Sequence, residues 1–494
     1  MELDFLLLFA ILLGCCLFVF GFLRKFNELF YVGLLEREIK SHLPPGDLGW
    51  PIIGNLLAFL KAFNSQDPES FINGLISRYG KTGIYRAFLF GKPTIIVCAP
   101  ETSRKVLQNM EELKHGYPKA TYILTGRKAL HSVTKEEHRR MRRLTTAPLS
   151  GHEALLSYIE YIEEIGVKTL EEVSSMKEPV ELLTETRKMG FKVITHVFMG
   201  EDSASIVATV NTLYTDLIGG MNYSLPINLP GFPFHKALKA RKKLVKIFQS
   251  ILDEKRACKS YQLPNAKKDL IGLLLEAEDE DGGTLEDEEI IDLLLSYLLA
   301  GHESSAHGIL WTVIYLLENP HILQKAKEEQ QEIMKRRPNT QKGLNLKETR
   351  QMEYLAKVID ETLRRTTISM ANFRESIVDV KLNGYIIPKG WKVMVMNRGV
   401  HLDPELHIKP KEFIPGRWDN EKPKAGSFLP FGAGARSCPG QELAKLEIII
   451  FLHYFLLYYK IERVNPEAPI NYLPIPAPSD KCLVTVTREA SYHL

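Results

Sequence analysis

The feature that most constrains this 494-residue chain is the loop at 431–440, FGAGARSCPG, which runs straight into an apolar helical stretch at 441–459. Gly432 and Gly434 let the backbone adopt conformations closed to other residues and pass close to a flat ligand. Cys438 is then expected just before a helix N-terminus, where the dipole and the free N–H groups favour a thiolate. The loop therefore predicts a site built around one cysteine.

Three readings of this loop are open from its residues alone. A thiolate held in this way suits an axial ligand of haem iron, and Arg436 would then pair with a haem propionate. A single cysteine is also a common inert core residue. A phosphate cradle is a third reading, but the loop lacks the Gly-Lys-Ser/Thr ending of a P-loop.

Composition supports one large, mostly helical domain. We find no internal repeat and no low-complexity linker, although the chain is longer than most single domains. The net charge of +3 comes from nearly balanced acids and bases, so the chain lacks the global signature of a nucleic-acid binder. Its six cysteines are too few and too scattered for a disulfide framework, which fits a reducing, cytosolic setting.

The N-terminus predicts a membrane anchor over residues 1–25. The stretch at 3–23 is almost wholly apolar, which is long enough for a helix to cross a bilayer. Arg24 and Lys25 follow it, whereas Glu2 and Asp4 precede it, so the positive-inside rule places the rest of the chain in the cytosol. A cleaved signal peptide is the alternative, but neither a basic start nor a small-residue cleavage site is clear.

The segment 26–55 is expected to be a stiff hinge between the anchor and the main domain at 56–494. Its core is LPPGDLGWP at 43–51, whose prolines and glycines exclude a regular helix. Short strands are predicted at 94–98, 378–387 and 392–396, and the remainder is predicted to be mainly helical.

Two basic stretches have a functional and a neutral reading. In the helical turn at 136–144, Arg142 is expected to face a haem propionate while the other arginines form a patch for an acidic electron-donor protein. The stretch at 236–246, which includes Arg241, would lie at the membrane surface. A solvated helix face explains either stretch equally well.

A long helix is predicted from the capping-box pattern at 284–287 to about Leu317, with Pro320 beyond its end. Within it, the stretch AGHESS at 300–305 is unusual for a buried helix, because glycine costs about 1 kcal/mol relative to alanine and hydroxyl residues compete with helical bonding. Either the helix opens a groove for a small ligand here, or a serine bonds back to the preceding turn.

A buried ion network is predicted between two further segments. Glu361 and Arg364 lie three residues apart on one helical face. Arg417, in the loop at 413–418, is a second arginine within reach of this pair if the segments meet. Such a network would fix the core around the cysteine loop.

Together these motifs resemble a membrane-bound cytochrome P450. The cysteine loop matches the family pattern Phe-x-x-Gly-x-Arg-x-Cys-x-Gly at every fixed position, beginning at Phe431, and the other motifs occur in the family's order. The resemblance covers essentially the whole chain. It implies the cytochrome P450 fold, mainly α with small β-sheets, preceded by one N-terminal transmembrane helix. It also implies a single-pass protein of the endoplasmic reticulum membrane whose catalytic domain faces the cytosol, and which is monomeric.

The resemblance also implies the cofactors and the roles of individual residues. The cofactor is haem b, and the enzyme uses O2 and electrons from NADPH delivered by NADPH-cytochrome P450 reductase. Cys438 is the axial ligand, and Glu303 and Ser304 occupy the positions of the acid and alcohol that relay protons, where the family more often has threonine in place of Ser304. The positions that match contacts to the haem are Arg142, His138, Arg374, Arg436 and Phe431.

Several stretches resemble most closely the plant group that contains ent-kaurenoic acid oxidases, β-amyrin 11-oxidase and cucurbitadienol-oxidising enzymes. The substrate pocket is expected to include Ile368, Ser369, Met370, Ala371 and Asn372. Small Ala371 would widen the site, and the Asn372 amide would meet a substrate hydroxyl or carbonyl. These residues favour a triterpenoid such as cucurbitadienol or β-amyrin over ent-kaurenoic acid. A lyase or isomerase of the same fold is disfavoured, since it needs no acid–alcohol pair.

Overall fold

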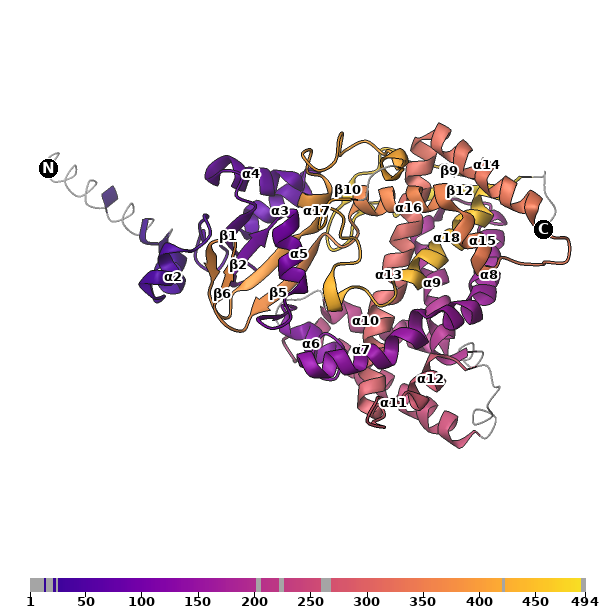
Figure 1. Cartoon of the computed structure of the whole chain (residues 1–494), viewed down its shortest axis with the longest axis horizontal. Helices are drawn as coiled ribbons and strands as arrows, with labels where there is room; N and C mark the ends of the chain where they lie inside the picture. The colour runs from indigo at the N-terminus through magenta and orange to yellow at the C-terminus, as the bar shows by residue number, and fades with distance from the viewer. Residues whose placement is uncertain are drawn as a thin grey trace.

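The computed structural model describes residues 13–14, 21–23, 25–200, 206–221, 226–258, 268–419 and 423–489. Within these residues the fold is mainly helical with small β-sheets, as the sequence predicted. Figure 1 shows the largest sheet toward one end of the molecule and a block of packed helices filling the other part.

The largest sheet brings together strands from both halves of the chain. Its order is β1 (Ile84–Leu89), β2 (Lys92–Val97), β8 (Lys392–Met396), β5 (Ala371–Ser376) and β3 (Leu113–His115). β2 and β8 are parallel, and the other neighbours are antiparallel. The predicted strands at 94–98 and 392–396 are thus confirmed to within two residues.

Three smaller sheets complete the β-structure of the described residues. The predicted β-stretch at 378–387 is a hairpin of β6 (Val380–Leu382) and β7 (Tyr385–Ile387). The other two sheets consist of β4 (Val180–Glu181), β12 (Leu483–Arg488) and β9 (Tyr459–Arg463), and of β10 (Ile470–Asn471) and β11 (Ala477–Pro478).

The helices surround one long central helix, α13 (Asp287–Glu318). The α-helices before it are α2 (Arg37–Ser41), α3 (Leu56–Asn64), α4 (Glu69–Tyr79), α5 (Pro100–Gln108), α6 (Lys119–Thr125), α7 (Lys135–Ser150), α8 (His152–Ser174), α9 (Leu182–Met199), α10 (Val207–Met221), α11 (Pro233–Ala257) and α12 (Leu270–Glu276). Those after it are α14 (Pro320–Arg336), α15 (Leu346–Gln351), α16 (Glu353–Thr366), α17 (Asn397–His401) and α18 (Gln441–Tyr458). Shorter helical turns are η1 (Glu28–Val32), η4 (Pro415–Trp418) and η5 (Gly434–Arg436).

Helix α13 is unbroken and begins slightly later than predicted. Its capping box is formed by Glu286 and Glu289, whereas Thr284 pairs with Glu278 in an isolated bridge. The helix continues without a break through 300–305, and the groove beside it stays a prediction. The alternative reading holds, because the Ser304 hydroxyl donates to the Ala300 carbonyl oxygen at 2.9 Å.

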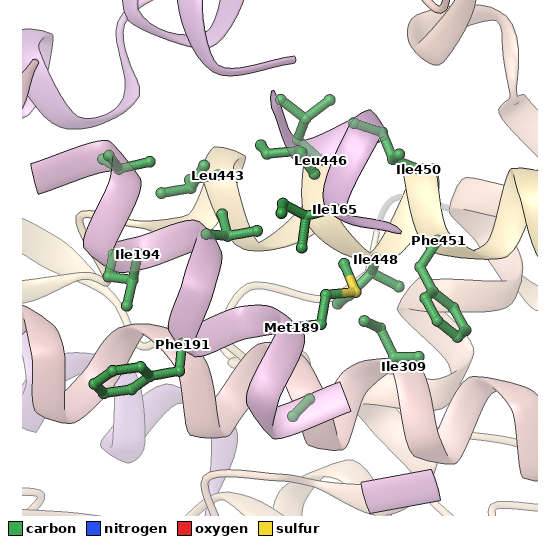
Figure 2. Packing of buried hydrophobic residues seen from close by; sticks show 14 of the residues in the cluster. Ile165, Met189, Phe191, Ile194, Ile309, Leu443, Leu446, Ile448, Ile450 and Phe451 are labelled. Carbon is green, nitrogen blue, oxygen red and sulfur yellow. The ribbon is translucent and has the colours of Figure 1, made fainter. Parts of the chain in front are cut away.

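The glycines of α13 serve close helix packing. A Cβ on Gly301 would lie 3.0 Å from the Ile194 side chain of α9, and one on Gly308 would lie 2.5 Å from the Ile448 side chain of α18. Figure 2 shows the apolar core that results, in which side chains of α8, α9, α13 and α18 interdigitate around Met189 and Ile448. This core holds α18, and with it the end of the cysteine loop, against α13.

The N-terminal anchor predicted at 1–25 lies almost entirely outside the described residues. Across the parts of the chain that are described, no helix combines the length and the apolar character that crossing a membrane requires. The proline-rich segment that follows is fixed to the main sheet, since Arg86 of β1 donates its backbone N–H to the Pro45 carbonyl at 2.9 Å. Leu48 in this segment is fully buried, and the Asn27 amide donates to its carbonyl at 2.9 Å.

Candidate haem-thiolate site

The cysteine loop is held in shape by its glycines and its own backbone. Gly432 and Gly434 both have φ of +74°, a left-handed conformation that favours glycine, as predicted. The Cys438 N–H donates to the Phe431 carbonyl at 2.9 Å, which closes the loop. Gly440 then forms the N-cap of α18. Cys438 is therefore fixed on a tight turn just before a helix, as the sequence indicated.

The surroundings of Cys438 do not by themselves produce a thiolate. The residue is exposed, yet the pKa of its thiol is raised, because desolvation outweighs the Gly440 N–H and the Arg142 guanidinium, which both lower it. The helix start favours the thiolate as expected, since the Gly440 N–H lowers the pKa of Cys438, but desolvation has the larger effect. A thiol that is accessible on one side and desolvated by the surrounding protein is suited to a ligand that binds against it. A metal ion that coordinates the sulfur removes the thiol proton outright.

Cationic side chains converge beside this loop without carboxylate partners. Arg374 of β5 is buried, and its Nε has no hydrogen-bond partner. Arg436 donates through Nη1 to the Leu113 carbonyl at 3.2 Å, while its Nε is also without a partner. The pKa of Arg374 is lowered to about 10 by desolvation and, to a lesser extent, by Arg436. No ion pair to either side chain is found within the described residues.

His138 and Arg142, both on α7, extend this group. The His138 ring is buried with Nδ1 unpartnered, and its pKa is lowered to about 4, mainly by desolvation and then by Arg436, Arg142 and Arg374. Buried cations and ring N–H donors without an internal anion are costly. They fit a ligand that brings its own carboxylates, as the two propionates of haem do. The residues present therefore fit the haem group.

The sequence analysis missed three aromatic residues in this group. His115 of β3 lies opposite Arg374 in the sheet, and its Nδ1 is 3.5 Å from Arg374 Nη1. Tyr117 stacks on the His115 ring, with ring centroids 5.5 Å apart, and the His131 ring is nearly perpendicular to both. The pKa of His131 is lowered to about 4 by desolvation. No local motif marks these residues, because strand pairing brings them together.

The predicted proton-relay residues lie on α13 in different surroundings. Ser304 is partly exposed and Ala300 is exposed, on a helix that is otherwise largely buried, so this face adjoins open space. Glu303 instead forms an ion pair with Arg187 of α9, and one of its oxygens is 3.7 Å from His307 Nδ1. Acid and alcohol therefore do not point to one place in this structure.

The Glu361 network is fully formed. Arg364 makes two hydrogen bonds of 2.9 Å to the Glu361 carboxylate, and Arg417 Nε lies 3.1 Å from both of its oxygens. Glu361 and Arg364 are completely buried. The two arginines hold the pKa of Glu361 below its usual value even though desolvation alone would raise it.

The predicted pocket residues divide between two sides of β5. Met370 and Ala371 pack into an apolar cluster with side chains of α3 and α4. Asn372 has a buried Nδ2 without a partner, and alternation along a strand places it on the same face as Arg374. Ile368, which is partly buried, and Ser369, which is exposed, lie in the turn before the strand.

The basic stretches are more neutralised than expected. Arg140 binds Asp279 at 2.8 Å and Glu289 at 3.3 Å, so it does not contribute to a free positive patch on α7. Arg241 of α11 forms an ion pair of 2.5 Å with Asp292, a buried residue of α13. Arg241 is therefore paired inside the protein, whereas Lys242, Lys243 and Lys246 of the same stretch are exposed, and the place of this stretch at a membrane surface stays a prediction.

Comparison with known proteins identifies the family of this chain. The cytochrome P450 family model matches residues 44–483. The chain is 53% identical to 7,8-epoxymelianol synthase of Citrus sinensis, over 97% of this chain and 98% of that protein. It is 53% identical to β-amyrin 11-oxidase of Glycyrrhiza uralensis, over 97% of each. It is 51% identical to ent-kaurenoic acid oxidase 1 of Arabidopsis thaliana, over 96% of each.

A solved structure shows the same fold. The cyanobacterial CYP120A1 with bound retinoic acid superposes with a TM-score of 0.79 at 27% identity, covering 91% of this chain and 99% of that one. The fold and the cationic site beside a cysteine loop define a haem-thiolate monooxygenase, which uses O2 and electrons that originate from NADPH. The chain belongs to the cytochrome P450 family.

Proposed function

We propose that this chain oxidises a plant triterpenoid that carries a hydroxyl or carbonyl group, such as cucurbitadienol or β-amyrin. When bound, the haem supplies the oxidising chemistry that inserts one atom of O2 into the substrate. The chain's own residues hold the cofactor, exclude water and orient the substrate. The choice of substrate therefore depends on the side chains that face the site.

The observation that carries this proposal is the buried Asn372 amide. Its Nδ2 has no acceptor within the described residues, and leaving a buried donor unpaired costs about 1–3 kcal/mol. Because Asn372 shares a strand face with Arg374, its amide is on the side of the sheet that faces the cofactor site. A substrate oxygen at this place would satisfy the amide and orient an otherwise apolar polycyclic molecule.

The names of the relatives support the same substrate class without deciding it. β-Amyrin 11-oxidase, at 53% identity, is named for a reaction on β-amyrin. Ent-kaurenoic acid oxidase 1, at 51% identity, is named for a different substrate. Because the two values are nearly equal, ent-kaurenoic acid remains the second candidate.

The test is a microsomal assay in yeast that co-expresses a plant NADPH-cytochrome P450 reductase. Cucurbitadienol, β-amyrin and ent-kaurenoic acid are supplied in parallel, and products are identified by mass spectrometry. Oxidation of a triterpene alone is the expected result. Conversion of ent-kaurenoic acid alone would overturn the proposal.

The role of Asn372 is tested in the same membranes by substrate-induced difference spectra. Asn372→Val should weaken binding of the hydroxylated triterpene by about tenfold, the effect of one lost hydrogen bond. Binding of a hydroxyl-free analogue of the same triterpene is the internal control and should not weaken. Equal weakening of both ligands would show that the substitution merely distorts the pocket.

We further propose that the enzyme acts as a monomer, is attached to the endoplasmic reticulum membrane and receives electrons from the reductase on its cytosolic side. Large apolar side chains are exposed around the N-terminal segment, which supports membrane attachment; they include Leu29, Phe30, Leu34, Ile52 and Leu57. Cell fractionation with protease protection tests this orientation. Recovery of the full-length chain in the soluble fraction would contradict it.

A further inference from the structure

His401 links the Glu361 network to the cysteine loop. It is the last residue of α17 and is fully buried. Its carbonyl oxygen accepts a hydrogen bond of 2.8 Å from Arg364 Nη1, which places it directly beside the network. No motif of the sequence marks this residue.

The hydrogen bonds of the imidazole fix its tautomer. The Leu429 backbone N–H donates to His401 Nε2 at 2.8 Å, so Nε2 is the unprotonated acceptor. Nδ1 must then carry the proton, and it donates to the Thr367 hydroxyl at 3.0 Å. That hydroxyl in turn donates to the Arg364 carbonyl at 2.9 Å. Each polar atom of the ring therefore has one partner and one role.

The ring stays neutral under working conditions. Desolvation is the largest cause that lowers the pKa of His401 to about 3, and His407, Arg364 and Arg398 lower it further. Protonation would place a second proton at Nε2, against the Leu429 N–H. The hydrogen bonds through which His401 joins α16 and α17 to Leu429 are therefore independent of pH in the neutral range.

The hydrogen bonds continue from Leu429 to the cysteine. The Gly432 N–H donates to the Leu429 carbonyl at 3.2 Å, and the Cys438 N–H donates to the Phe431 carbonyl at 2.9 Å. Leu429 is thus two residues from the carbonyl that positions Cys438. A displacement of Leu429 would therefore move the start of the loop, and with it the Phe431 carbonyl that accepts from the Cys438 N–H.

We propose that His401 is the positioning residue that sets the place of the Cys438 sulfur relative to the Glu361 network. Its hydrogen bonds hold Leu429, and with it the start of the cysteine loop, in a fixed position relative to α16. Outer partners of a metal ligand orient it and tune the metal, so His401 affects the iron although it does not touch it.

The test compares His401→Phe with His401→Gln in the holoenzyme. Phenylalanine keeps the ring volume but leaves the Leu429 N–H and the Thr367 hydroxyl without partners at this place, whereas glutamine offers one acceptor and one donor. For His401→Phe we expect a roughly tenfold fall in the ratio of thiolate-ligated to other ferrous carbon monoxide complexes, and a shifted reduction potential, because two buried hydrogen bonds are lost. For His401→Gln both readouts should return most of the way to wild type.

His453→Phe is the matched control. His453 lies on α18, is also fully buried and bonds to Gln330 at 2.9 Å, but within the described residues no hydrogen bond joins its ring to the cysteine loop. It should lower stability without changing the carbon monoxide spectrum or the potential. If His401→Phe behaves like His453→Phe, the proposal is wrong.

A second variant keeps the test decisive if His401→Phe fails to fold. Thr367→Val preserves shape but removes the partner of Nδ1 and the bond to the Arg364 carbonyl. It should shift the spectrum and the potential in the same direction as His401→Phe, but less, because the Leu429 bond remains. Unchanged readouts in Thr367→Val, or a folded His401→Gln that lacks the thiolate spectrum, would overturn the proposal.

Discussion

Two regions of the molecule bury arginine in opposite ways. In the Glu361 network, Arg364 and Arg417 are neutralised by a carboxylate of the same chain, with each contact near 3 Å. Beside the cysteine loop, Arg374 is buried and Arg436 partly buried, and neither has a carboxylate partner among the described residues. The first region is complete when the chain folds, whereas the second requires an anion from outside.

This difference separates scaffold from ligand site. A buried charge that the chain itself pairs holds elements together, since removing one partner leaves the other uncompensated. A buried charge that the chain leaves unpaired lowers the stability of the fold and raises its affinity for a suitable ligand. The two regions should therefore respond in opposite directions to the loss of a charged side chain.

The largest effect is expected for Glu361→Ala. It leaves Arg364 and Arg417 buried without their counter-ion, which costs about 3–5 kcal/mol of the free energy of unfolding. The loop that carries Cys438 then loses its support, so haem content should fall together with stability. Thermal unfolding and haem content of the purified variant check this. A variant with wild-type stability would show that the network is not the scaffold.

Arg374→Met should act in the opposite direction on the apoprotein. It removes a desolvated cation, so the free energy of unfolding of the apoprotein should stay unchanged or rise by up to about 2 kcal/mol. Haem should dissociate at least about tenfold faster, because a charge-assisted hydrogen bond to the cofactor is lost. Urea unfolding of the apoprotein and the rate of haem transfer to an acceptor protein measure the two effects. A lower free energy of unfolding of the Arg374→Met apoprotein would contradict the prediction that the two regions respond in opposite directions.

The pH dependence of the free energy of unfolding of the apoprotein tests, at His138, the same contrast between the scaffold and the ligand site. Its pKa is about 4 in the folded chain, against an ordinary value of 6.5. The unfolded chain therefore binds a proton more readily between these values, and His138 makes the folded state less stable as pH falls from 6.5 to 4, by at most about 1.4 kcal/mol per pH unit. His138→Phe should reduce this slope in urea titrations at pH 7, 6 and 5.

Bound haem gives the control for His138. Propionates near the ring favour its charged form and raise its pKa toward the ordinary value. The holoprotein should therefore lose less stability than the apoprotein over the same pH interval. Identical slopes would mean that His138 does not face the propionates.

The sequence was sufficient to predict those features of the site that depend on the spacing of neighbouring residues. The positive φ of Gly432 and Gly434, the start of α18 after Cys438 and the i, i+3 pairing of Glu361 with Arg364 all follow from neighbouring residues. The order of the motifs then predicted the fold class, because it matches the order in the cytochrome P450 family.

Features that depend on distant segments were not predicted. Arg187 and Glu303 are 116 residues apart, so their ion pair could not be inferred from the acid–alcohol motif. His115 meets Arg374 only through the pairing of β3 with β5. The desolvation that raises the pKa of Cys438 was not predicted for the same reason, since it depends on the whole surrounding fold rather than on the helix start.

The smallest effect is expected at an exposed ion pair that joins the same elements as the buried network. Lys357 of α16 and Asp419, which follows η4, lie 2.8 Å apart with side chains 31% and 48% exposed. Solvent and salt screen such a pair, so Lys357→Ala should cost no more than about 1 kcal/mol of the free energy of unfolding. Thermal unfolding in low and high salt measures it, and the difference from wild type should disappear at 1 M salt, where the screening length is only about 3 Å. A loss as large as that of Glu361→Ala would mean that joining α16 to η4, rather than neutralising buried arginines, is what stabilises this region.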